Sequence, residues 1–194
     1  YLSAAIQMIN EFLPKDRLIV YTQGRRSRRE EFRSDGRGSY QNLPVIVLID
    51  ETSASASEIF SGAIQDNDRG IIVGRRSFGK GLVQQPIEFS DGSLIHLTIA
   101  RYYTPSGRCI QKPYVKGQPK EYEMDLVTRY ERGEFFHQDS IHQTGEAYTT
   151  SIGRTVYGGG GIMPDYFVAE DTSAITPYYT ECAVKGTIAQ FCFE

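Results

Sequence analysis

Runs of apolar and polar residues divide the first part of the chain into short elements. Residues 4–13 place apolar side chains at helical spacing and are followed by Pro14, which predicts a helix. A short strand is expected at residues 18–21. The segment 24–38 is rich in Arg and Gly and poor in apolar residues, which predicts an exposed loop.

A strand, a helix and a second strand follow in close succession. Residues 45–49 are all apolar, which is typical of a strand covered on both faces in a parallel sheet. Apolar positions within residues 59–64 are spaced as on one face of an amphipathic helix, and residues 71–73 form the next apolar strand. This βαβ pattern predicts an α/β fold with a right-handed crossover.

The second half of the chain adds a hairpin and a polar segment. Asp91-Gly92 lies between strand-like runs at 82–89 and 94–103, which predicts a β-hairpin. Residues 113–154 are polar and rich in Tyr, and we expect them to form an inserted subdomain on the surface.

The domain organisation follows from that insertion. Residues 1–112 are expected to form the core, to which residues 155–194 return. Within these segments, we expect a helix over 121–132, a strand near 166–168 and a terminal helix over 176–193.

Composition excludes several classes of function. No apolar run approaches the ~18 residues that a membrane-spanning helix needs. A formal net charge of -3 gives no overall attraction for DNA or RNA. The three cysteines, Cys109, Cys182 and Cys192, form no CxxC or Cys/His pattern, so we expect no metal site and no disulfide framework. No nucleotide-binding motif is present, and no cofactor is expected.

The end of the first buried strand is a candidate reactive site. Ser53, Ser55 and Ser57 lie where this strand passes into a helix, and a helix N-terminus offers unpaired N–H groups that can stabilise an oxyanion. The same serines can simply cap the helix, with Glu58 completing a capping box from Ser55. The local pattern alone favours capping.

A nucleophilic serine needs a base. No G-x-S-x-G motif surrounds any serine; His96 lies in a strand, where a packing or surface role is favoured, and His137 and His142 lie in the polar insertion. Lys80, between two glycines, is the alternative, since a lysine amine in apolar surroundings can act as a base. If residues 80–84 are extended, Gln84 shares a face with Lys80 and can hold the amine in place.

Three stretches together resemble the C-terminal processing, or tail-specific, proteases, which are serine peptidases of bacterial envelopes and plastids. The stretches are SASASEIFSGAIQDNDRGIIVGRRSFGKGLVQ, LTIARYYTPSGR and GGGIMPD. The resemblance extends over most of residues 1–112 and about 155–170. It implies a crotonase/ClpP-like ββα core and an endopeptidase that cleaves proteins near or from their C-terminal tails by a Ser-Lys acyl-enzyme mechanism.

Matched position by position, the resemblance implies a role for each candidate residue. Ser55 is then the nucleophile, Lys80 the general base and Gln84 the residue that orients the lysine, while the Ala56 N–H donates to the oxyanion. In the family a Gly-Gly turn before the first helix supplies a second oxyanion donor, and a PDZ domain precedes the core. Neither is found in this sequence, which predicts a fragment of a longer protein.

The resemblance also implies partners and a location. We expect protein or peptide substrates with apolar C-terminal tails, a homo-oligomer as one possible assembly, and a place in the bacterial periplasm or cell envelope.

Two other functions compete with the peptidase. One is a non-catalytic binding or scaffold fragment, inactive because the upstream oxyanion and PDZ parts are missing. The other is a crotonase-like acyl-thioester enzyme, which uses a related βαβ unit but needs no Ser–Lys pair. The joint presence of Ser55, Lys80 and Gln84 favours the peptidase.

Overall fold

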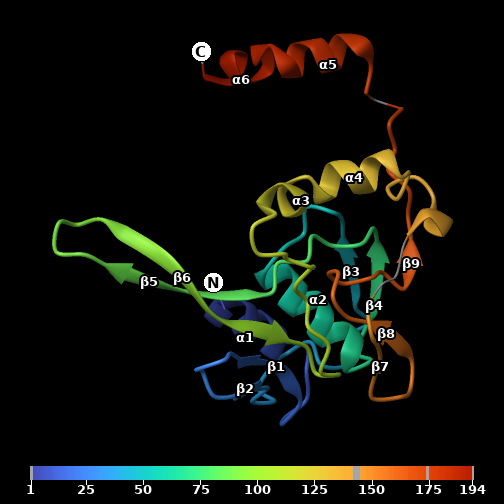
Figure 1. The fold of residues 1–194 in the computed structure, drawn as a ribbon. Coiled ribbons are helices and arrows are strands. Elements are labelled where there is room, and N and C mark those ends of the chain that lie inside the picture. Colours follow the sequence, from blue (N-terminus) through green and yellow to red (C-terminus); the bar gives the residue numbers. More distant parts are fainter. Residues whose placement is uncertain (1, 142–144, 174, 194) are drawn as a thin grey trace.

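The computed structural model describes residues 2–141, 145–173 and 175–193, which form three β-sheets and several helices (Figure 1). The antiparallel sheet joins, in this order, β2 (Glu30–Arg33), β1 (Leu18–Gln23), β6 (Leu94–Tyr103) and β5 (Leu82–Glu88). The parallel sheet joins β3 (Ile46–Ile49), β4 (Ile71–Gly74) and β9 (Tyr166–Phe167), while β7 (Ala147–Thr149) pairs antiparallel with β8 (Thr155–Tyr157). The helices are α1 (Leu2–Asn10), α2 (Ala56–Asp66), α3 (Pro119–Glu123), α4 (Asp125–Glu131), the 3₁₀-helix η1 (Gln138–Ser140), α5 (Pro177–Val184) and α6 (Thr187–Phe193).

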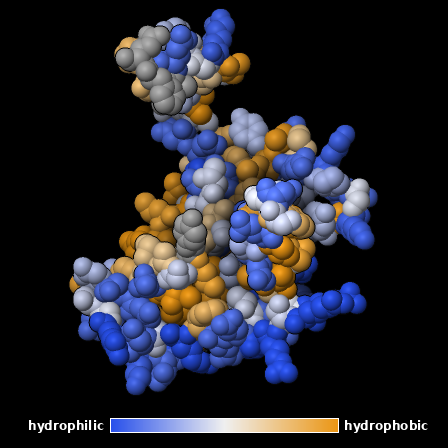
Figure 2. Space-filling model, turned by 90° about the vertical axis from the view of Figure 1, so that its left-hand side faces the viewer, coloured by the Kyte–Doolittle hydropathy of each residue, from blue (hydrophilic) through white to orange (hydrophobic). Residues whose placement is uncertain are grey.

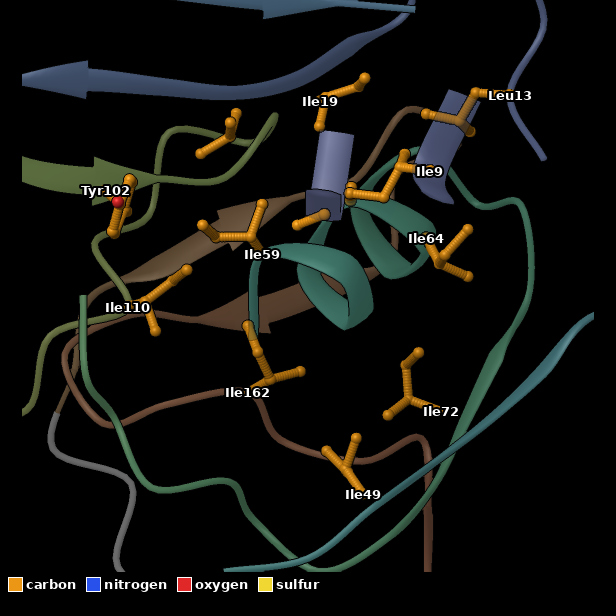
Figure 3. Close-up of a cluster of buried hydrophobic side chains, with 13 residues drawn as sticks. Ile9, Leu13, Ile19, Ile49, Ile59, Ile64, Ile72, Tyr102, Ile110 and Ile162 are labelled. Atoms are coloured by element: carbon orange, nitrogen blue, oxygen red, sulfur yellow. The ribbon is translucent and has the colours of Figure 1, made fainter. Parts of the chain in front are cut away.

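Helix α2 is buried on almost every side rather than along a single stripe. From Glu58 to Asp66, every residue except Phe60 is buried. Figure 3 shows why: apolar side chains from α1, both larger sheets and the connecting loops surround the helix, among them Ile9, Ile19 and Ile72. The amphipathic pattern thus predicted the helix correctly but predicted burial of one face only. The helix is buried more fully because other elements pack against it on several sides.

The predicted βαβ unit is present, but β3 is not buried on both faces. β3 and β4 pair in parallel, with Ile46 opposite Ile71. Ile49 is 6% exposed and belongs to the core around α2, whereas Ile46 is 65% and Leu48 77% exposed. The expectation of burial on both faces is therefore wrong, because the face that carries Ile46 and Leu48 is left uncovered in the described structure.

The β5–β6 hairpin forms where the Asp-Gly turn predicts it and projects from the rest of the molecule (Figure 1). Figure 2 views the molecule from the side on which the hairpin projects, and hydrophobic side chains gather over the middle of this face. The exposed apolar residues of the hairpin are Ile87, Phe89, Leu94, Ile95 and Leu97.

Three further elements differ from the sequence-based expectation. The segment 24–38 contains β2, which pairs with β1, although its side chains are mostly exposed. The single helix expected over 121–132 is two helices, α3 and α4, separated at Met124. The terminal helix is likewise divided into α5 and α6, because Gly186 adopts a positive φ of 67° between them.

Ile49→Ala is expected to lower the free energy of unfolding by about 2–5 kcal/mol, because it removes a buried side chain and leaves a cavity beside α2. Leu48→Ala, one residue earlier on the exposed face, should change it by only about 0.5 kcal/mol or less. Urea titration followed by circular dichroism measures both. Equal losses for the two variants would contradict this placement of the core.

Candidate active site

Ser55 occupies a strained turn at the start of α2. Its backbone has φ 57° and ψ −110°. The other described non-glycine residues with positive φ are Asp16 and Asp68, and aspartate tolerates that conformation better than most residues. Strained backbone is often retained at reactive residues, and a sharp strand-to-helix turn is how α/β-hydrolases present their nucleophilic serine. The backbone therefore distinguishes Ser55 from its two serine neighbours.

Ser53 and Ser57 have different surroundings. The Ser53 hydroxyl accepts a hydrogen bond from the Asp50 N–H and donates to Asp50 Oδ1, both at 3.1 Å. Partial burial alone would raise the pKa of the Asp50 carboxyl, but hydrogen bonds from Thr52 and Ser53 outweigh it and lower that pKa. Ser57 is exposed on α2. Ser53 therefore serves the turn after β3.

The Ala56 N–H lies where an oxyanion donor is expected. Ala56 is the first residue of α2, and the first N–H groups of a helix have no intrahelical acceptor. No hydrogen bond within the described ranges uses this N–H. Beside the turn, an apolar cavity of about 310 Å³ is lined by residues of α1, β3 and α2, including Met8, Leu48 and Phe60.

The carboxylate of Glu58 joins the Ser55 turn to the loop that carries Lys80. Its Oε2 accepts the N–H groups of Ser55 and Lys80, each at 2.8 Å. Its Oε1 accepts the Gly79 N–H and the Ser77 hydroxyl, each at 2.6 Å. Because the Ser55 and Lys80 amides share one oxygen, their nitrogens lie no farther apart than twice 2.8 Å.

Glu58 is fully buried, and two opposing effects act on its pKa. Burial raises the pKa of the carboxyl and is the larger effect, while the four donated hydrogen bonds lower it. All four groups donate to the carboxylate oxygens. An ionised carboxylate only accepts hydrogen bonds, so this set of donors matches the ionised form.

The backbone around Lys80 is fixed, whereas its side chain is exposed. The Gly79 carbonyl accepts from the Lys112 N–H at 2.9 Å, and the Gly81 N–H donates to Gln111 Oε1 at 2.9 Å. Gly79 itself has φ 88°, which favours glycine there. The lysine side chain lies at a cavity of about 480 Å³.

Gln84 lines the same cavity as Lys80, although β5 begins only at Leu82 and its pairing register shifts between Val83 and Gln84. Within the described ranges, no hydrogen bond links the Ser55 hydroxyl, the Lys80 amine and the Gln84 amide. The structure thus brings the backbones of Ser55 and Lys80 together and places Lys80 and Gln84 on one cavity, without closing a chain of side-chain hydrogen bonds.

Neither of the two histidines in the described ranges lies where it could act as a base for Ser55. His96 is exposed on the hairpin, where it pairs with Pro86, and His137 is exposed before η1. Neither of them is hydrogen-bonded to Ser55. His142 lies outside the described residues.

The part of the chain that the structure describes holds neither a cluster of metal ligands nor a membrane-spanning helix. No group of three or more His, Cys, Asp or Glu side chains there is arranged to hold a metal ion. Cys109, Cys182 and Cys192 are free thiols. No helix of the described ranges combines the length and the apolar character needed to cross a membrane.

The sequence pattern predicted the helix-capping contact of Glu58 but not its contacts with the Lys80 loop. The S-x-x-E spacing identified it as a helix-capping residue, and its bond to the Ser55 N–H is the corresponding contact. Its bonds to Ser77, Gly79 and Lys80 reach 19 to 22 residues along the chain, and no local pattern encodes them. The available signal in the sequence was a carboxylate among the apolar positions of the helix, which indicates a buried carboxylate that needs hydrogen-bond donors.

Glu58→Gln is expected to destabilise the protein by about 1–3 kcal/mol for each donor that loses its acceptor, because an amide offers one oxygen and its NH₂ would face N–H donors. Urea unfolding measures the loss. Glu181→Gln is the matched control, since Glu181 makes one solvent-exposed ion pair, with Lys185, and its loss should cost no more than about 1 kcal/mol. Similar losses for the two variants would mean that the Glu58 bridge contributes little.

Comparison with known proteins finds relatives that are named as C-terminal processing proteases. The carboxyl-terminal-processing protease of Synechocystis sp. is 43% identical over 111 residues, which are 57% of this chain and 26% of that protein. The chloroplastic C-terminal processing peptidase of Tetradesmus obliquus is 42% identical over 113 residues, 56% of this chain and 24% of the relative. The chain thus spans about a quarter of the length of these relatives.

Solved structures and a family model agree with these relatives. The photosystem II D1 C-terminal processing protease superposes with a TM-score of 0.59 at 25% identity, over 87% of this chain and 31% of that one. A putative S41 protease from Bacteroides fragilis shares the fold with a TM-score of 0.54 at 14% identity, over 91% of this chain and 36% of that one. Residues 1–120, more than half of the chain, match the model of peptidase family S41. The chain therefore belongs to peptidase family S41.

Proposed function

We propose that this chain carries the catalytic residues of a serine endopeptidase that cleaves proteins near their C-terminal tails through a Ser-Lys acyl-enzyme. The observation that supports it most is the shared carboxylate: the strained Ser55 and the Lys80 loop are bound to the same oxygen of Glu58. Membership of family S41 and the names of the relatives point to the same activity.

In the first half of the proposed reaction, Ser55 attacks the scissile carbonyl. The neutral amine of Lys80 takes the hydroxyl proton as the bond from Oγ to the carbonyl carbon forms. The Ala56 N–H donates to the resulting oxyanion, aided by its position at the positive end of α2. As the C–N bond breaks, the Lys80 ammonium gives its proton to the leaving amine, which leaves an ester on Ser55.

The second half removes that ester. Lys80 takes a proton from a water molecule, which attacks the ester carbonyl, and the same N–H group stabilises the second oxyanion. The ester C–O bond breaks, and the proton on Lys80 returns to the Ser55 oxygen. Gln84, on the same cavity as Lys80, is proposed to orient the amine, and a bound substrate would exclude water from the now exposed lysine side chain.

Several wider features of the protein belong to the same proposal. The βαβ unit and the hairpin are consistent with a crotonase/ClpP-like ββα core with residues 113–154 as an inserted subdomain. The apolar cavity beside Ala56 is suited to apolar substrate side chains. We further propose protein substrates with apolar C-terminal tails and a location in the bacterial periplasm or cell envelope.

A second candidate function is binding without cleavage. It is favoured by one observation: the Lys80 amine is exposed and makes no hydrogen bond to Ser55 within the described ranges. On this alternative the chain keeps the peptidase fold but engages peptides only.

The proposal predicts that p-nitrophenyl butyrate acylates the chain at Ser55 and releases p-nitrophenolate in a burst equal to one acyl group per chain. Absorbance follows the burst, and the mass of the modified peptide locates the acyl group. Ser55→Ala and Lys80→Ala should each abolish the burst while remaining folded, since one removes the nucleophile and the other the base.

Matched controls are available for both variants. Ser90→Ala removes an exposed serine at the turn of the β5–β6 hairpin, and Lys116→Ala removes an exposed lysine far from Glu58 in sequence; both should retain the burst. An undiminished burst in Ser55→Ala, or an acyl group found on another residue, would refute the assignment. A folded chain without any burst would support binding without cleavage.

A further inference from the structure

The segment after Ile110 packs against the loop that carries Lys80. This loop, residues 75–81, follows β4 and contains no helix or strand. Its conformation therefore depends on contacts from neighbouring segments. Glu58 supplies those contacts on one side. On another side, Gln111 and Lys112 bind the two glycines that flank Lys80, as described above.

A buried lysine extends this support to an aromatic pair. The Lys112 ammonium lies 4.0 Å from the ring centre of Phe78 and 4.3 Å from that of Tyr122, the latter in α3. It also donates to the Tyr122 carbonyl and to Asp125, each at 3.1 Å. Cation–π contacts of this kind are strongest when the cation is withdrawn from water, and Lys112 is 4% exposed.

Arg129 of α4 then binds the backbone of the loop itself. Its guanidinium donates to the Arg76 carbonyl at 2.7 Å and to the Ser77 carbonyl at 3.1 Å. It also donates to Glu134 at 2.9 Å, and Glu134 in turn accepts two bonds of 2.7 Å from the Arg76 side chain. Arg129 and Glu134 are both nearly inaccessible to solvent.

We propose that Arg129 is a positioning residue for Lys80, acting through the carbonyls of Arg76 and Ser77. The proposal rests on the proposed function, in which Lys80 is the base. Arg129 lies beyond residues 1–120, which match the family model, so its role belongs to the polar segment of this chain. The segment at 113–154 is thereby part of the candidate active site rather than a surface addition.

The geometry predicts a particular kind of defect when Arg129 is lost. Arg129→Met frees the two carbonyls, while Glu134 keeps both bonds from Arg76 and no buried carboxylate is left unpaired. The loop then moves relative to Ser55. A displacement of a reacting group by about 1 Å can slow a reaction by about 10²-fold, so we expect acylation to slow by about ten- to hundredfold.

The test combines acylation kinetics with hydrogen exchange on the unmodified chain and its variants. With p-nitrophenyl butyrate, Arg129→Met should lower the acylation rate constant at saturating ester and leave the half-saturating concentration unchanged. The final amount of acylated Ser55 should also be unchanged, whereas partial unfolding would reduce that amount. Amide exchange should accelerate in residues 75–81 and not in β3 or β4.

Arg154→Met is the matched control. Arg154 also makes three bonds, to Asp68, Asp165 and the Gln65 carbonyl, near the end of α2 opposite to Ser55. It should leave both the acylation rate and the exchange of residues 75–81 unchanged. Unchanged exchange in Arg129→Met, or faster exchange with a normal acylation rate, would overturn the proposal. If the unmodified chain is not acylated at all, the proposed function fails, and the exchange pattern alone decides whether Arg129 holds the loop.

Discussion

A buried carboxylate at the start of α2 holds together two segments that are far apart in the sequence. The Glu58 carboxylate accepts a hydrogen bond from the Ser55 N–H in one segment. From the other segment it accepts hydrogen bonds from the Gly79 and Lys80 N–H groups and the Ser77 hydroxyl. A carboxylate without partners in this position would be costly, because it has no access to water. With four donors it fixes the relative positions of the proposed nucleophile and base.

The rest of the fold supports that contact. Helix α2 is enclosed by side chains from α1 and both larger sheets, so the helix start and Ser55 have little freedom to shift (Figure 3). The Lys80 loop lacks regular structure and is instead held between Glu58, the segment at Gln111 and Lys112, and Arg129 of α4. The polar segment therefore contacts the loop of the proposed base, whereas the proposed nucleophile lies at the start of the buried helix α2.

Local sequence patterns predicted the elements that depend on local chemistry. The hairpin follows from Asp91-Gly92, and the βαβ unit follows from two apolar runs separated by a helical period. Periodicity failed where tertiary neighbours decide the outcome: β3 is exposed on one face because no element of the described ranges covers it. Gly186 divides the terminal helix, a break that the apolar pattern alone did not indicate.

The candidate site was predictable in part. Resemblance to a protease family singled out Ser55, Lys80 and Gln84, and the strained backbone of Ser55 now gives a physical reason to prefer it over Ser53 and Ser57. The contacts of Glu58 and Arg129 join residues distant in the sequence, and only the three-dimensional arrangement reveals them.

The most direct test of this account is a crystal structure of the chain after reaction with p-nitrophenyl butyrate. The account predicts an ester on Ser55 Oγ whose carbonyl oxygen lies about 3 Å from the Ala56 nitrogen. It also predicts the Lys80 amine beside the ester oxygen, with the Glu58 bridge intact. An acyl group on another residue, or a Lys80 amine directed away from an acylated Ser55, would contradict it.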